Sequence, residues 1–73
     1  MNILPLMKNE LLGLIIARGL TQKEVANKLG ITPNTFYAKM SKGIFGSNEI
    51  EKMIDLLKIN DPAYIFFGIK VTQ

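Results

Sequence analysis

The sequence contains no cysteine and no histidine among its 73 residues. These residue types supply thiol nucleophiles, imidazole bases and most zinc ligands, so their absence excludes disulfide-stapled folds, zinc fingers and His-dependent catalytic triads. The carboxylates show no paired spacing for acid and base catalysis, and there is no glycine-rich phosphate loop. We therefore expect neither an enzyme nor a site for a metal, a cofactor or a small-molecule substrate. Because cysteine is absent, a cytoplasmic location is the simplest expectation.

Long apolar runs are also missing. The apolar stretch at residues 11–16 is far shorter than the roughly 18 residues that a membrane span needs, so we expect no membrane segment. A chain of 73 residues has room for one domain, residues 1–73, and one core. Such a core rarely supplies more than about 3 to 5 kcal/mol, so dimerisation or a partner would matter to stability.

The spacing of the apolar residues predicts an all-α fold of five helices. We expect the helices at residues 6–18, 21–29, 33–42, 47–58 and 62–67, followed by a short tail at residues 69–73. In the first helix Leu12 and Ile16 widen the apolar face, so we expect enclosure on most sides, and Gly13 suggests a close helix crossing. Ser47 and Asp61 are the expected caps of the last two helices. Phe45 is expected to enter the core from a loop, and Glu49 to face solvent.

Residues 21–43 contain two short helices, each with a start and a stop signal. Thr21 and Glu24 have the spacing of a capping box, and Gly30 is the residue type that ends a helix in the left-handed conformation. Thr32 followed by proline repeats the start signal, and Gly43 repeats the stop. A helix, a three-residue connection and a second helix form the geometry of a helix-turn-helix, whose second helix enters the DNA major groove.

Positive charge is concentrated in the same stretch. Between residues 21 and 43 four lysines stand against one glutamate, a net charge of +3, whereas residues 47–61 carry two lysines against four carboxylates, a net −2. Lysines solvate many exposed helices, but over this motif they favour a surface that faces phosphates.

The residues that carry a resemblance are Thr21, Gln22, Val25, Ala26, Leu29, Gly30, Ile31, Asn34, Thr35, Phe36, Lys42 and Gly43. With them the chain resembles the Cro and repressor class of helix-turn-helix regulators, most closely the small phage lysis–lysogeny switch proteins of Cro-like and modulator-of-repression type. The resemblance spans about two thirds of the chain, from residue 21 to 68. It implies a compact five-helix, lambda-repressor-like bundle in the cytosol of a host bacterium.

The resemblance also implies which side chains meet DNA. On the second motif helix they are Thr32, Asn34, Thr35, Tyr37, Ala38, Lys39 and Ser41. Asn34 is the best base reader, because a carboxamide can pair with N6 and N7 of adenine, and Tyr37 can reach a thymine methyl or a phosphate. Lys39 and Lys42 are expected to contact phosphates, which positions the helix without reading sequence. Gln22 resembles the phosphate-contacting glutamine of the family.

One position departs from the family pattern. Pro33 stands where many members present a long polar side chain, and the helix has no arginine, the residue of the commonest specific base contact. Two interpretations follow. The first is a Cro-like transcriptional regulator of the lysis–lysogeny switch, acting at operator DNA alone or with a partner repressor. The second is an antirepressor, or modulator of repression, that binds a CI-type repressor through Pro33, Asn34, Tyr37 and the Phe66 region and alters that repressor's DNA binding. An antitoxin would usually add a toxin-neutralising segment, which is not evident in this sequence.

The helix at 62–67 carries four consecutive large apolar residues, which cannot all face one core. One interpretation is that two or three of them close the core while the Tyr64 hydroxyl stays in water. The other is a self-association surface made of Tyr64, Phe66 and Phe67, which would give a homodimer. Residues 69–73 alternate apolar and polar, which fits either an extended dimerising arm or a frayed tail.

Overall fold

The computed structural model describes residues 6–68. Over these residues the chain is all-helical, as predicted, and has five helices: α1 Lys8–Ala17, α2 Gln22–Leu29, α3 Pro33–Lys42, α4 Ser47–Leu57 and α5 Pro62–Phe67. Within the same residues, no helix has the length and apolar character needed to cross a membrane. The predicted dimerising arm at 69–73 lies outside the described part of the chain.

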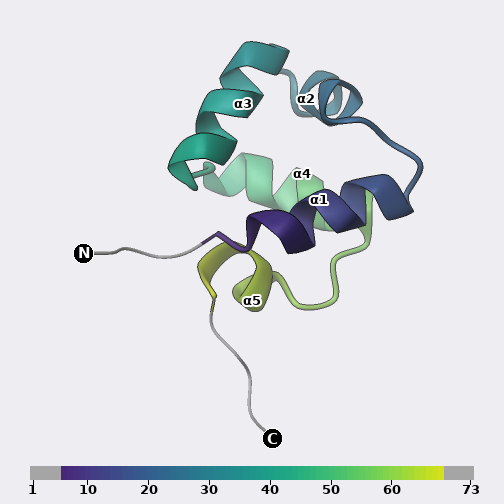
Figure 1. Ribbon diagram of the computed structural model, residues 1–73, viewed down its shortest axis with the longest axis vertical. Coiled ribbons are helices and arrows are strands. Elements are labelled where there is room, and N and C mark those ends of the chain that lie inside the picture. The colour runs from purple at the N-terminus through teal and green to yellow at the C-terminus, as the bar shows by residue number, and fades with distance from the viewer. Residues whose placement is uncertain (1–5, 69–73) are drawn as a thin grey trace, which may run out of the picture.

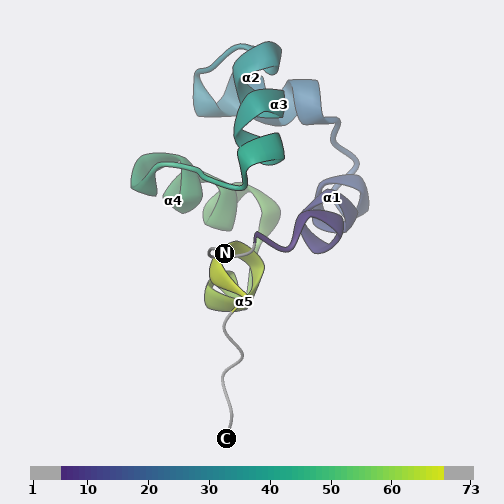
Figure 2. The same ribbon diagram turned by 60° about the vertical axis from the view of Figure 1, so that its left-hand side comes forward.

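The helices are arranged in three levels (Figure 1). Helices α2 and α3 pack against each other at one end, α1 and α4 lie beneath them, and α5 lies at the opposite end, an order that Figure 2 shows again from a second direction. Helix α2 contacts α1, α3 and α4, whereas α1 also contacts α5. A backbone hydrogen bond of 2.8 Å, from the Met7 N–H to the Ile65 carbonyl, joins the residue before α1 to α5.

The ends of α2 and α3 confirm the predicted start and stop signals. Thr21 Oγ1 accepts a hydrogen bond from the Glu24 N–H at 3.1 Å, and Glu24 Oε1 accepts one from the Thr21 N–H at 2.9 Å. Thr32 Oγ1 accepts from the backbone N–H three residues later, also at 3.1 Å. Gly30 and Gly43 then end the two helices at φ values of 80° and 77°, which a side chain would disfavour.

The core is apolar and draws on every helix. Its most deeply buried side chains are those of Leu11, Ile15, Val25, Phe36, Met53 and Leu57. Phe45 enters this core from the loop between α3 and α4, as predicted, and its ring centroid lies 5.5 Å from that of Phe36. Helix α3 is therefore anchored on the core by two side chains, Phe36 and Met40, of which Met40 is 7% exposed.

Two predictions about α1 are wrong. The Ile16 side chain is 74% exposed, so α1 is not enclosed on most sides. A Cβ atom on Gly13 would meet no atom within 4 Å, so no close crossing requires this glycine. Only the face that carries Leu11 and Ile15 is buried, because α1 is an outer helix that packs through one side.

The last two helices correct four further expectations. Gly46, not Ser47, is the N-cap of α4, and the Glu49 carboxylate turns back to accept from the Gly46 N–H instead of facing solvent. Asp61 occupies the N-cap position of α5, but its side chain makes no capping hydrogen bond. Phe66 is 3% exposed and belongs to the core, so it offers little surface for self-association; Phe67 is 41% exposed. Tyr64 is partly buried against the core.

Candidate nucleic-acid interface

Helix α3 is an outer helix with one anchored face and one free face. Phe36 and Met40, one turn apart, are both buried and fix the helix on the core. The opposite face is open to solvent and carries the exposed side chains of Asn34, Thr35, Tyr37, Ala38, Ser41 and Lys42. These are six of the side chains that the sequence predicts as the contact surface, and the fold brings them together on one helix.

The first turn of α3 is well ordered by its own hydroxyl groups. Thr32 Oγ1 donates to Thr35 Oγ1 at 2.9 Å while it accepts from the Thr35 N–H. Because the Thr35 hydroxyl is the acceptor in this pair, it retains a proton that it can donate to another group. Pro33 is partly buried at the first helical position, and it offers no polar group. Asn34 is therefore the only exposed carboxamide of this turn.

Tyr37 lies one turn further along the same face as Asn34. Its side chain is 46% exposed, and its ring meets the buried Phe36 ring edge-on, with the centroids 6.5 Å apart and the planes at 74°. This edge contact restricts the orientation of an otherwise solvated side chain. The surface thus presents a carboxamide and a phenol hydroxyl that are held on one helical face.

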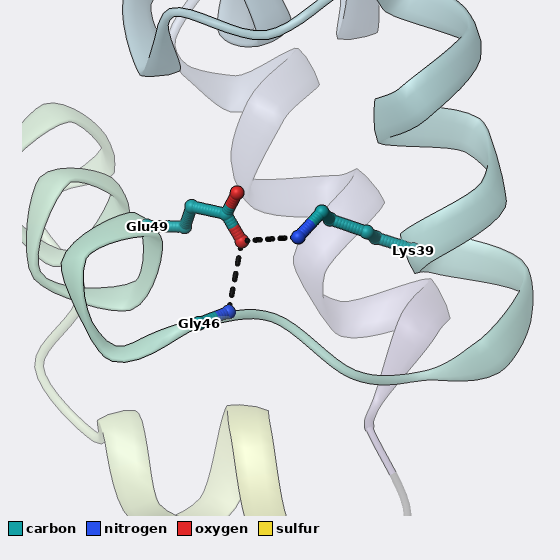
Figure 3. Close-up of polar contacts among 3 residues, drawn as sticks. All are labelled: Lys39, Gly46 and Glu49. Carbon is teal, nitrogen blue, oxygen red and sulfur yellow. Dashed lines mark hydrogen bonds and ion pairs between the residues drawn. The ribbon is translucent and has the colours of Figure 1, made fainter.

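Lys39 is engaged within the protein. Its Nζ lies 3.1 Å from Glu49 Oε1, the same oxygen that accepts from the Gly46 N–H at 2.8 Å (Figure 3). The carboxylate thereby joins α3 to the start of α4. A phosphate contact by Lys39 stays a prediction, but any phosphate must compete with Glu49 for the ammonium group.

A second lysine reaches the end of α3 from a distant part of the chain. Lys8 Nζ, at the start of α1, donates to the Ser41 backbone carbonyl at 3.1 Å. Lys42 is exposed on the last turn of the same helix. Two cationic groups therefore stand at the C-terminal end of α3, where they also complement the helix dipole. No local sequence pattern pointed to Lys8, because the two contacting residues are 33 positions apart.

The outer side of α3 carries a shallow depression next to Lys39 and Lys42. This shallow depression, called here the α3 hollow, is lined by Thr35, Ala38, Lys39, Lys42 and Ile44. Ile44 follows the end of α3 and is 68% exposed, a feature that sequence reasoning missed. Gln22, the predicted phosphate contact on α2, is partly buried at the first position of that helix.

Comparison of the chain with protein-family models, with curated proteins and with solved structures gave no match. The resemblance to the Cro and repressor class thus stays a prediction from the residues. What the structure adds is the geometry of α3: a polar face open to solvent, anchored from below by two buried side chains.

Proposed function

We propose that this protein is a Cro-like transcriptional regulator of a phage lysis–lysogeny switch, in which α2 and α3 form a helix-turn-helix and α3 enters the major groove of operator DNA. The observation that carries the proposal is the exposed face of α3, with Asn34 and Tyr37 one turn apart above the buried Phe36. A helix anchored by one face and polar on the other has the form that groove recognition needs.

The connection between the helices supports this proposal. Helix α2 ends at Gly30 in the left-handed conformation, and α3 begins at Pro33 after a connection of three residues. A turn of this length, with a glycine, is typical of the helix-turn-helix. The small side chain of Ala26, which is fully buried, lets α2 and α3 pack closely.

The proposed contacts divide into two kinds. Asn34 reads adenine through its carboxamide, and Tyr37 contacts a thymine methyl or a phosphate. Lys42 and Lys8 contact phosphates near the end of α3, and Gln22 contacts a phosphate at the start of α2. Only the two lysines neutralise phosphate charge, so the slope of log K against log salt is expected to be about −2. That footprint is small, so binding as a pair or beside a repressor would raise the affinity.

The proposal is tested by selection of DNA from a pool of random duplexes at low salt. We expect enrichment of a short sequence that contains adenine, and we expect Asn34→Ala to reduce binding to it by about 1 to 3 kcal/mol, or 5- to 150-fold. Asn27→Ala is the matched control, because Asn27 is exposed on α2 outside the α3 face. Failure to enrich any sequence, together with no binding at low salt alone or beside a repressor, would remove the proposal.

A second candidate function is favoured by what α3 lacks. The helix has no arginine, Pro33 offers no polar group, and Lys39 is held by Glu49, so the cationic and base-reading groups are few. The exposed ring of Tyr37 is a residue type enriched in interface hot spots. In this second proposal α3 binds a CI-type repressor and blocks or alters its DNA binding. Co-purification with a CI-type repressor separates the two: a complex that excludes operator DNA supports modulation, and one that loads onto DNA supports joint repression.

A further inference from the structure

A second hollow lies next to α3, on the side that faces α5. It is lined by the buried side chains of Leu6, Phe45 and Phe66, and at its margin by Ile44 and Phe67, two of the large apolar side chains that remain exposed. Its volume is about 60 Å³. Figure 1 shows the corresponding part of the fold, where the chain entering α1 passes between the end of α3 and α5. This depression is called here the apolar hollow.

The size of the apolar hollow limits what can enter it. An apolar cavity that holds a benzene ring measures about 150 Å³, more than twice the volume of this one. The hollow therefore holds the tip of a leucine, isoleucine, valine or methionine side chain but cannot enclose a whole aromatic ring. Because Ile44 lines both the apolar hollow and the α3 hollow, one bound segment can contact both.

Two lysines lie close to the apolar hollow. Lys42 lines the adjoining α3 hollow, and Lys8 lies two residues from Leu6, with its ammonium group at the last turn of α3. Of the carboxylates in this region, that of Glu49 is paired with Lys39, and that of Glu10 lies in a separate depression with Leu6 and Lys8. A segment that enters the apolar hollow thus meets two ammonium groups that carboxylates would complement.

We propose that the apolar hollow binds a segment of a different protein, with one aliphatic side chain inserted between Ile44 and Phe67 and with carboxylates paired to Lys42 and Lys8. This goes beyond the proposed operator binding, because it uses the loop after α3 and α5 instead of the Asn34 face. The two proposals share Lys42 and Lys8 but differ in their other residues, so Asn34→Ala tests operator binding alone, whereas Ile44→Ser and Phe67→Ser test this surface alone.

The same observations disfavour two other occupants. A DNA backbone gains nothing from a hollow lined by six apolar side chains, because its groups are charged or polar. A second copy that meets this surface with the same surface would bring its own Lys8 and Lys42 against like charges. A second copy that inserts its exposed Ile16 instead would form a head-to-tail contact, which continues into open filaments unless the rotation closes.

The test is selection of random peptides displayed on phage against the immobilised full chain. We expect the selected peptides to combine a leucine, isoleucine, valine or methionine with aspartate or glutamate. Ile44→Ser should weaken their binding about tenfold or more, because it removes the side chain that both hollows share. Phe67→Ser should act in the same direction from α5. Lys42→Ala should weaken binding a few-fold and reduce its salt dependence.

Ile16→Ser is the matched control, because it replaces an equally exposed isoleucine on α1 and should leave peptide binding unchanged. Circular dichroism melts confirm that the variants fold. The proposal is overturned if no peptide is enriched, if the enriched peptides are basic or aromatic, or if they bind Ile44→Ser as tightly as wild type. Sedimentation that shows self-association abolished by Ile44→Ser would assign the surface to a second copy and also overturn it. Loss of operator binding alone would count against the proposed function and not against this surface.

Discussion

The ion pair between Lys39 and Glu49 leads to a quantitative expectation for DNA binding. Lys39 Nζ lies 3.1 Å from Glu49 Oε1, so the positive charge that Lys39 would offer to a phosphate is already largely neutralised. In Glu49→Gln the negative charge is removed, while the amide oxygen can still accept from the Gly46 N–H. We expect this variant to release Lys39 to the DNA backbone, so that binding becomes tighter at low salt and more sensitive to added salt.

The size of the effect follows from the release of one condensed counterion per phosphate contact. One added contact steepens the slope of log K against log salt by about 0.9. Between about 50 and 200 mM salt, a fourfold change, the variant should lose about 3.5-fold more affinity than wild type. The ion pair is partly exposed, with 33% of the lysine and 15% of the glutamate side chain accessible, so its loss should cost at most about 1 kcal/mol of folding free energy.

The assay is fluorescence anisotropy with the selected duplex over a series of salt concentrations. Glu51→Gln is the matched control, because it removes an exposed carboxylate of α4 without releasing Lys39. The double variant Lys39→Ala/Glu49→Gln tests the mechanism, since it has no ammonium group to release and should show the wild-type slope. In the wild-type background, Lys39→Ala should change the slope by clearly less than 0.9.

Two results would refute this reasoning. One is a slope for Glu49→Gln equal to that of wild type or of Glu51→Gln, which would mean that Lys39 does not reach a phosphate when released. The other is a full reduction of about 0.9 in slope for Lys39→Ala alone, which would mean that DNA already displaces Glu49 in the wild-type complex.

Three further predictions concern stability and are measured by urea unfolding. Thr21→Ala removes the hydroxyl that accepts from the Glu24 N–H and should lower the unfolding free energy by about 1 kcal/mol, whereas an unchanged midpoint would contradict the capping role. Gly43→Ala places a Cβ at φ 77° and 3.5 Å from the Leu6 Cβ, so we expect a loss of about 1 to 2 kcal/mol; a stabilised variant would be incompatible with the left-handed helix end. Ile16→Ser should change stability by less than about 0.5 kcal/mol, because this side chain is 74% exposed, and a loss of several kcal/mol would mean that Ile16 is buried in solution.

Local signals predicted the ends of α2 and α3. A capping box, a proline after a threonine and a glycine stop each act within a few residues, so the sequence alone specifies them. Helical spacing also places Phe36 and Met40 one turn apart on the same face of α3, and the structure buries both. The five helices were predictable because the spacing of apolar residues along a helix is also a local pattern.

The errors concern which of several apolar side chains faces the core. Residues 11–16 of α1 are apolar on several sides, so the pattern does not show that Leu11 and Ile15 are buried while Ile16 is exposed. Likewise, Phe66 and Phe67 are adjacent and chemically identical, and only the packing of α5 buries the first and leaves the second exposed. These outcomes depend on how the helices are placed in space.

Contacts between residues that are far apart in the sequence could not be predicted either, because they too depend on how the helices are placed in space. The Lys39–Glu49 pair depends on the angle between α3 and α4, and the hydrogen bond from Lys8 to the Ser41 carbonyl joins residues 33 positions apart. Both change the electrostatics of the candidate interface: the first engages a lysine, and the second adds one. Ile44 was missed because a loop residue has no periodic pattern that reports its exposure.

The central claim, that the exposed face of α3 meets operator DNA, is tested most directly by a titration of the isotope-labelled protein with the selected duplex, followed by amide and side-chain NMR shifts. The account predicts that the largest changes fall on Asn34, Tyr37 and Lys42 and on the start of α2. Saturable binding whose largest changes fall on α4 or α5, with the Asn34 carboxamide unmoved, would contradict it.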